Sequence, residues 1–160
     1  MRQKQKGTTL LEVLIAVLIL SIGLLGHSKI QALGVRAATD ANLRTQATTL
    51  ANEMIERLRA NRPAADSGYY STIDYASIDC DAGPAKICSE GTAGSAGDCT
   101  MDEIANEDAV HWFCAVEDSI PNGNVAVSVA AGVYSIQVSW DGLDENGATQ
   151  SRNVSSMFIP

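Results

Sequence analysis

Residues 1–26 read MRQKQKGTTLLEVLIAVLILSIGLLG, and this stretch decides how the rest of the chain is organised. Three cations precede Gly7, and a nearly continuous apolar run follows, interrupted by the carboxylate of Glu12. The run approaches the roughly 20 residues that a helix needs to cross a bilayer. An ionised carboxylate in lipid is costly unless a partner neutralises it. We therefore expect Glu12 to have such a partner.

This N-terminal stretch differs from an ordinary secretory signal. The apolar run extends from Thr8 to Leu25, which is longer than the about 7–15 apolar residues of a cleavable signal, and no A-x-A site follows it. The basic leader predicts a cytoplasmic N-terminus and an exported C-terminal part. An uncleaved anchor, the alternative interpretation, explains the cations and the apolar run but neither Gly7 nor Glu12.

The exported part is strongly acidic. The 160-residue chain has a formal charge of −8, and from Ala64 onward fifteen acids accompany only two cations, Lys86 and Arg152. Binding to a phosphate backbone needs clusters of Lys and Arg, so we expect no nucleic-acid partner. The length predicts one domain plus an anchor, with a core too small for a large enzyme.

Four cysteines lie in this exported part: Cys80, Cys88, Cys99 and Cys114. An even number of cysteines in an oxidising compartment predicts two disulfides, for which three pairings are possible. A metal site is the alternative, since His111 and Cys114 lie three residues apart on a predicted helix. The chain has no C-x2-C pair and its other spacings are irregular, which favours disulfides over a metal.

A single long helix is predicted over residues 8–61, where no proline occurs. Its first half is apolar on all sides, as in a membrane segment or a filament core. Glu53 and Arg57 form a favourable i,i+4 pair in its second half, and Pro63 is expected to end the helix. The second half also carries an apolar stripe at helical spacing. The stripe consists of Leu43, Ala47, Leu50, Met54 and Leu58.

The middle of the chain, residues 64–100, is predicted to be a long cysteine-bearing loop. It is rich in Gly, Ala, Ser and Asp, with one short strand expected near residues 73–78. A loop of this length needs to be fastened, which the cysteines can do. Its three tyrosines are candidates for anchoring it to the core: Tyr69, Tyr70 and Tyr75.

A second helix is predicted over residues 101–120. Thr100 and Glu103 have the spacing of a capping box, and an apolar row at helical spacing follows them, with Trp112 as a core anchor. Asp108 is the one polar interruption of that row. Pro121 marks the end of the helix.

Three or four antiparallel strands are predicted over residues 124–160. Apolar and polar residues alternate over residues 125–129 and 134–140, and a last strand is expected at residues 152–159. Turns are expected at Gly132, Asp141-Gly142 and Asn146-Gly147. The amphipathic half of the long helix is the natural cover for the apolar face of this sheet. The predicted fold class is therefore α+β.

The segment KGTTLLEV, residues 6–13, resembles the class III signal of type IV prepilins and type II secretion pseudopilins. In that family a membrane peptidase cuts after the glycine and N-methylates the new first residue. The resemblance implies cleavage between Gly7 and Thr8, methylation of Thr8, and Glu12 as the fifth mature residue. Pairing of Glu12 with the α-amine of the next subunit would neutralise two charges in an apolar setting. Most major pilins have an aromatic residue where Thr8 stands, which favours a minor pilin or a pseudopilin.

Three further stretches, residues 21–26, 51–62 and 134–140, resemble the PilV family of minor type IV pilins, and the helix running into Ile120–Gly123 also fits. This resemblance implies a type IV pilin-like fold without catalysis or cofactors. It implies a low-abundance subunit that primes or modifies pilus assembly, in a tip complex. The implied partners are minor and major pilins, the prepilin peptidase and the inner-membrane assembly platform.

The expected domain organisation follows from these features. Residues 1–7 are a cytoplasmic leader, residues 8–28 a membrane or filament-core segment, and residues 29–160 a periplasmic head whose helical part reaches residue 62. The protein is expected in the bacterial inner membrane as a single-pass protein and then in the pilus at the cell surface. Two alternatives remain open: a type II secretion pseudopilin, and a membrane-anchored periplasmic adhesin or binding module.

Few residues point to any other chemistry. The sequence has no G-x-S-x-G, Walker, H-E-x-x-H or G-x-G-x-x-G motif, so no catalytic residues are assigned. An acidic turn near the C-terminus offers carboxylates for calcium, but its spacing departs from the EF-hand loop, and we expect a solvated hairpin without metal. The residues of this turn are Asp141, Asp144, Glu145 and Asn146.

Overall fold

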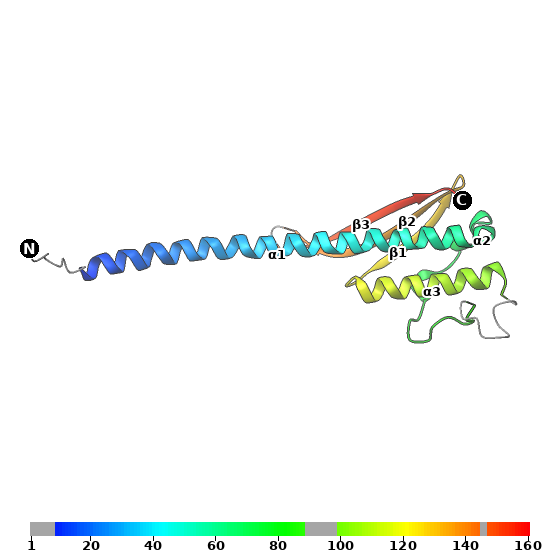
Figure 1. The fold of residues 1–160 in the computed structure, drawn as a ribbon, viewed down its shortest axis with the longest axis horizontal. Helices are drawn as coiled ribbons and strands as arrows, with labels where there is room; N and C mark the ends of the chain where they lie inside the picture. The colour runs from blue at the N-terminus through cyan, green and yellow to red at the C-terminus, as the bar shows by residue number, and fades with distance from the viewer. Residues whose placement is uncertain (1–8, 89–98, 145–146) are drawn as a thin grey trace, which may run out of the picture. The chain divides into compact units, whose positions relative to one another are not determined.

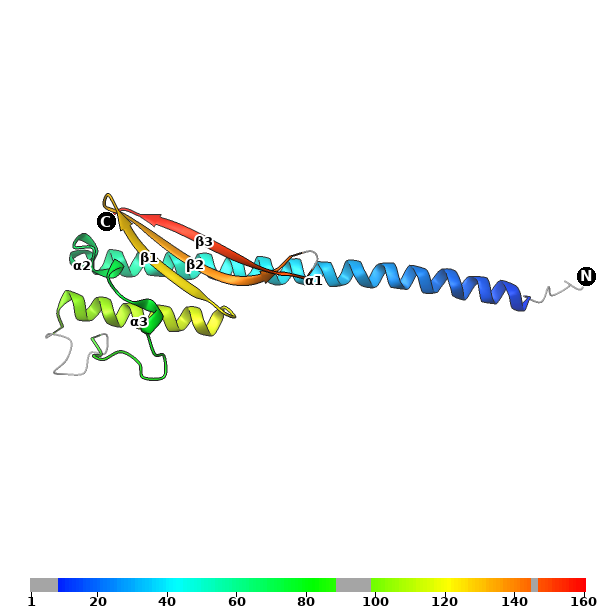
Figure 2. The same ribbon diagram turned by 180° about the vertical axis from the view of Figure 1, so that it is seen from behind.

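The computed structural model describes residues 9–88, 99–144 and 147–160, and the chain divides into two compact units, Met1–Thr39 and Asp40–Pro160. A long helix, short helices and a three-stranded antiparallel sheet confirm the predicted α+β class (Figures 1 and 2). The elements are α1 Leu10–Ala60, α2 Arg62–Asp66, η1 Tyr69–Ser71, η2 Tyr75–Ser77, α3 Met101–Ser119, β1 Asn124–Ala130, β2 Val133–Leu143 and β3 Thr149–Phe158.

The first unit is the N-terminal part of α1. An 18-residue window of α1 reaches a mean hydropathy of 2.3, and none of this window is buried. The helix is long and apolar enough to cross a membrane. The expected leader, residues 1–7, lies outside the described residues, as does Thr8.

The second unit is built on a sheet with strand order β1-β2-β3. β1 pairs with β2 from Asn124 opposite Ser139 to Ala130 opposite Val133, and β3 pairs with the other edge of β2. Ala131 and Gly132 connect β1 to β2 with φ angles of 51° and 78°. Positive φ at both positions is what a two-residue hairpin turn requires, so the expected turn at Gly132 is present.

The expected turn at Asp141-Gly142 is wrong, because both residues belong to β2. Gly142 pairs with Gln150, and a Cβ on Gly142 would lie 3.1 Å from Cγ of Arg152. The glycine therefore provides space for the arginine side chain within the sheet. The chain reverses after β2, where the backbone N–H of Gly147 donates to the carbonyl of Asp144 at 3.1 Å.

The apolar core of the second unit lies on the inner face of the sheet. Alternate residues of β2 are buried there, as the period of a strand predicts. The second half of α1 contributes the apolar stripe found in the sequence, and α3 contributes Trp112, which is fully buried. The cluster includes Ala47, Leu50, Met54, Leu58, Tyr134, Ile136, Val138 and Trp140.

α1 ends at Ala60, one residue before the predicted end of the helix at residue 61. Asn61, with φ −110° and ψ 61°, separates α1 from α2, and Pro63 lies within the first turn of α2. Proline is tolerated there because the first N–H groups of a helix have no intrahelical acceptor. The side chain of Asn61 donates to the carbonyl of Met101 at 2.7 Å, which joins this corner to the start of α3.

The strand expected near residues 73–78 is wrong, because this segment forms the 3-10 turn η2. The Asp74 side chain accepts a hydrogen bond from the N–H of Ala76 at 3.2 Å. Such local side-chain bonds compete with strand pairing. Tyr70 and Tyr75 are buried and anchor the segment to the core, as expected.

Candidate functional site

The N-terminal candidate site begins where the described residues begin. Gly7 and Thr8 lie outside them, whereas Glu12 lies in the first turn of α1. The carbonyl of Thr9 accepts hydrogen bonds from the N–H groups of Glu12 and Val13 at 3.0 and 3.3 Å. A carboxylate in the first turn interacts favourably with the positive end of the helix dipole. Its side chain is exposed, and within the described ranges no residue forms an ion pair with it.

An exposed apolar surface extends on both sides of Glu12 along the first half of α1. Its large aliphatic side chains are exposed on all sides of the helix; Leu18, for example, is 62% exposed. A contiguous apolar surface of this extent marks contact with lipid or with other proteins. These side chains are Leu10, Leu11, Val13, Leu14, Ile15, Val17, Leu18, Ile19, Leu20, Ile22, Leu24, Leu25, Ile30, Leu33 and Val35.

The four cysteines form two disulfides, Cys80–Cys114 and Cys88–Cys99. The first ties the loop after η2 to α3. Cys114 is therefore not available as a metal ligand beside His111. No group of three or more His, Cys, Asp or Glu side chains that could hold a metal occurs among the described residues.

Glu107 is a buried carboxylate that the sequence did not single out. It is 4% exposed, and its Oε2 accepts a hydrogen bond from the backbone N–H of Cys88 at 2.9 Å. Its Oε1 lies 3.6 Å from Nε2 of the half-exposed His111. Glu107 thus connects the loop to α3 close to the second disulfide, which is a structural role. Its neighbours in the chain, Asn106 and Asp108, are also polar, so nothing in the sequence marked Glu107 as the buried one.

Asp108, the polar interruption in the apolar row of α3, is the centre of a hydrogen-bonded cluster. Arg57 donates to its Oδ1 at 2.9 Å and Tyr70 donates to its Oδ2 at 2.8 Å. Arg57 also pairs with Glu53 at 2.7 Å. A buried charge is tolerated when it is paired and hydrogen-bonded in this way.

Two pKa values reflect this cluster. Burial alone lowers the pKa of Arg57, but its hydrogen bonds to Glu53 and Asp108 outweigh that effect and the pKa is raised. Burial, reinforced by the charge of Asp108, raises the pKa of Tyr70. The cluster is therefore a fixed ion pair with a neutral tyrosine, and it holds α1, η1 and α3 together.

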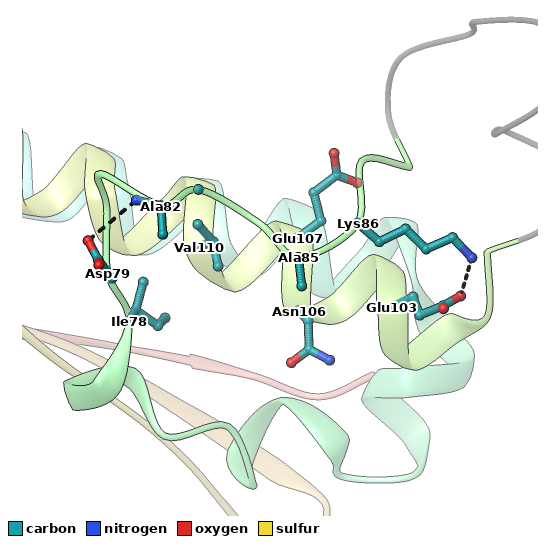
Figure 3. A pocket seen from close by; sticks show the side chains of 10 residues that line it. Ile78, Asp79, Ala82, Ala85, Lys86, Glu103, Asn106, Glu107 and Val110 are labelled. Atoms are coloured by element: carbon teal, nitrogen blue, oxygen red, sulfur yellow. Dashed lines mark hydrogen bonds and ion pairs between the residues drawn. The ribbon is translucent and has the colours of Figure 1, made fainter.

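A groove of about 580 Å³ lies between the loop over residues 78–86 and α3 (Figure 3). Lys86 pairs with Glu103 across one end at 2.9 Å. Hydrogen bonds from the backbone of Thr100 and from Lys86 lower the pKa of Glu103. The described lining contains no serine, cysteine or histidine.

Comparison with known protein families gives two matches. The model of the prokaryotic N-terminal methylation motif matches residues 2–26. The model described as Tt1218-like, type IV pilin Tt1218, matches residues 29–110, which is just over half of the chain. No curated protein and no solved structure gives a significant match.

Proposed function

The chain belongs to the Tt1218-like family of type IV pilins, and we propose that within it this protein is a minor pilin that primes or modifies pilus assembly. Family membership makes it a structural subunit with a prepilin signal and a membrane-anchoring helix. Such a subunit interacts with other pilins and with the prepilin peptidase. We place the mature protein in the inner membrane, with a periplasmic head, before it enters a tip complex.

The observation that carries the proposal is the position of Glu12. Its carboxylate lies in the first turn of an exposed apolar helix and has no ion-pair partner among the described residues. Cleavage between Gly7 and Thr8 creates a cationic α-amine on Thr8, four residues before this carboxylate. When apolar helices of two subunits pack together, Glu12 of one can neutralise the amine of the other. Leaving either charge unpaired in that setting would cost several kcal/mol.

Two sequence features support a minor rather than a major subunit. Thr8 is not aromatic, and residues 21–26, 51–62 and 134–140 resemble PilV proteins. The two disulfides fit an exported head. The Tt1218-like match favours a pilus over a type II secretion pseudopilus, because its description names a type IV pilin.

Processing is tested by the intact mass of the protein purified from membranes with and without the prepilin peptidase. The expected mass with the peptidase corresponds to loss of residues 1–7, gain of one methyl group and loss of four hydrogens for the two disulfides. The unprocessed mass in both strains would contradict the proposal.

The role of Glu12 is tested by Glu12→Ala, with Glu56→Ala as the matched control. Glu56 is an exposed glutamate of the same helix that pairs with Arg59 at its surface. We expect Glu12→Ala to abolish incorporation into pili and Glu56→Ala to leave it intact. Deletion of the gene should reduce the number of surface pili. Lost exoprotein release with intact pili would indicate a pseudopilin, and lost adhesion alone would indicate an adhesin.

A further inference from the structure

The two edges of the sheet differ in how they are covered. At the β1 edge, η1 and α3 lie next to the strand, and a Cβ on Gly68, directly before η1, would lie 3.7 Å from Cγ1 of Val129. β3 forms the other edge, on the side of the sheet away from α3 in both views (Figures 1 and 2). Among the residues that the structure describes, no further strand pairs with β3. We call this outer side of β3 the bare edge.

The register of the sheet assigns the backbone groups of the bare edge. A two-residue turn at Gly132 places a hydrogen-bonded pair, Ala130 and Val133, next to it. Backbone groups of successive residues point to opposite sides of a strand, so those of Tyr134 face β3 and those of its partner Phe158 face β2. Every second residue of β3, counted from Met157 towards the N-terminus, therefore directs its N–H and C=O away from the sheet. These residues are Ser151, Asn153, Ser155 and Met157.

β3 has few of the features that protect the edges of natural sheets. Edge strands are usually short, carry Lys, Pro or inward-pointing charges, or contain a bulge. β3 has 10 residues, Thr149–Phe158, contains no Pro, Lys, Asp or Glu, and keeps an unbroken register with β2. Its one charged residue, Arg152, lies near the start of the strand. The rest of the bare edge is therefore open to a further strand.

The side of α1 that faces β3 is a single row of side chains. Both ends of this row contact β3. Oδ1 of Asp40 lies 3.6 Å from Nε of Arg152, and Cζ of Arg59 lies 5.3 Å from the centre of the Phe158 ring. Residues three or four apart between these ends lie on the same side of the helix. They are Arg44, Thr48, Ala51 and Ile55.

Arg44 is the free charge of this row. It is exposed, and no ion pair joins it to another residue within the described ranges. Arg59 and Arg152, in contrast, are paired with carboxylates of α1. On β3 itself, Val154 is only partly buried, whereas its partner Val138 is fully buried. A strand that adds to β3 would meet this guanidinium and cover this valine.

We propose that the bare edge binds an extended segment of another protein, which adds to the three-stranded sheet and places a carboxylate at Arg44. Backbone hydrogen bonds supply the affinity of such strand addition, and alternate side chains supply its specificity. Side chains of the added strand that face α1 lie beside Val154 and are apolar. Those on the outer face lie beside Asn153 and Ser155 and are polar. Guanidinium groups hold carboxylates through paired hydrogen bonds.

The occupant is a different protein because a second copy of this chain does not fit the bare edge. Symmetric pairing of two β3 edges needs antiparallel strands. Copies that are anchored in one membrane, as the proposed function requires, hold β3 in the same direction. β3 also contains no carboxylate that could pair with Arg44. Antiparallel pairing of two copies is the competing outcome of the test.

The openness of the edge is tested by amide hydrogen exchange of the full-length protein in mild detergent. The amides of Asn153 and Ser155 should exchange rapidly, whereas those of Val154 and Ser156, which face β2, should be protected. Protection of all four amides in the free protein would show that the edge is already covered and would overturn the inference.

Strand addition is tested with a fluorescent peptide of the length of β3 that alternates valine with threonine and carries one glutamate. Ser155→Pro removes an outward N–H and leaves the pairing with β2, because proline is tolerated on the free side of an edge strand. Ser155→Ala is the matched control, since it keeps this N–H. Fluorescence anisotropy should show about tenfold weaker binding to Ser155→Pro and unchanged binding to Ser155→Ala.

Two further measurements sharpen the result. The same peptide methylated on alternate backbone nitrogens should not bind, which keeps the test independent of whether Ser155→Pro folds. Arg44→Gln should weaken binding of the glutamate peptide about threefold and leave binding of a glutamine peptide unchanged.

Several results would contradict strand addition by another protein. They are a wild-type protein that does not bind the peptide, equal binding of the methylated peptide, and equal binding by folded Ser155→Pro and Ser155→Ala. Self-association that Ser155→Pro abolishes, without peptide binding, would show that the occupant is a second copy.

The edge contact and the proposed function can fail separately. If Glu12→Ala abolishes incorporation into pili but the peptide does not bind, the pilin function stands and the edge contact is wrong. If the peptide binds as expected while the leader is uncut and Glu12→Ala is silent, the edge contact stands and the assembly role is wrong.

Discussion

The two halves of α1 have the same secondary structure but opposite surroundings. Leu18 in the first unit is 62% exposed, whereas Leu58 in the second is fully buried. The first half is apolar on every side, and the second is apolar only along the stripe that faces the core. The second half is therefore stabilised by its own head, and the first half depends on lipid or on neighbouring subunits.

The strongest test of this contrast is one substitution made in both halves. Leu58→Ala should lower the free energy of unfolding of the head by about 2–5 kcal/mol, because it leaves a cavity in a packed core. Leu18→Ala should leave that free energy unchanged, since this side chain has no part in the core. Urea unfolding of the full chain in mild detergent, followed by tryptophan fluorescence, measures both. Equal losses would contradict the division into two units.

The disulfides extend the contrast, since all four cysteines lie in the second unit. Replacing Cys80 and Cys114 by alanine should cost about 2–4 kcal/mol, and the Cys88–Cys99 pair should contribute less. A disulfide that closes a longer loop stabilises more, and the sequence separation is 34 residues for Cys80–Cys114 but only 11 for Cys88–Cys99. Unfolding temperatures of the two double variants test which disulfide stabilises the head more. Extraction from membranes checks that the first unit is unaffected. A reversed order would show that local packing outweighs loop closure.

The cluster around Asp108 should contribute less than the core to the free energy of unfolding of the head. Asp108→Ala removes the acceptor of Arg57 and Tyr70 and should cost about 1–3 kcal/mol, because both donors are left partly buried. Asp118→Ala, an exposed change on the same helix, should stay within about 0.5 kcal/mol. Denaturant unfolding of the two variants in parallel gives the comparison. Equal effects would mean that the cluster adds nothing beyond surface charge.

The tyrosines of the head should make its stability fall at alkaline pH. Burial raises the pKa of Tyr70 and of Tyr75, so both stay protonated when folded while the unfolded chain ionises near pH 10. Their stabilisation is complete below pH 10 and is lost as the pH rises above it, by about 1.4 kcal/mol per pH unit for each tyrosine. Tyrosinate absorbance during alkaline unfolding measures this, and Tyr75→Phe should reduce the slope by the contribution of one tyrosine. Ionisation of either tyrosine in the folded head would contradict it.

Several features were predictable because they depend on local sequence. The long helix, the capping box of Thr100 and Glu103, the hairpin at Gly132 and the burial of Trp112 follow from periodicity and turn chemistry. The prepilin signal was recognisable for the same reason, because its chemistry needs a fixed spacing between a glycine and a carboxylate. Local rules failed at Gly142, whose role depends on Arg152 of the neighbouring strand.

The sequence by itself determined the division into an apolar anchor and an acidic, disulfide-bonded head, because polarity and cysteine number are properties of composition. Only the tertiary structure decided the pairing of the cysteines, the role of Asp108 and the contact between Gly142 and Arg152. These features join residues that are far apart in the chain. Their proximity depends on how α1, α3 and the sheet pack, and no local pattern encodes it.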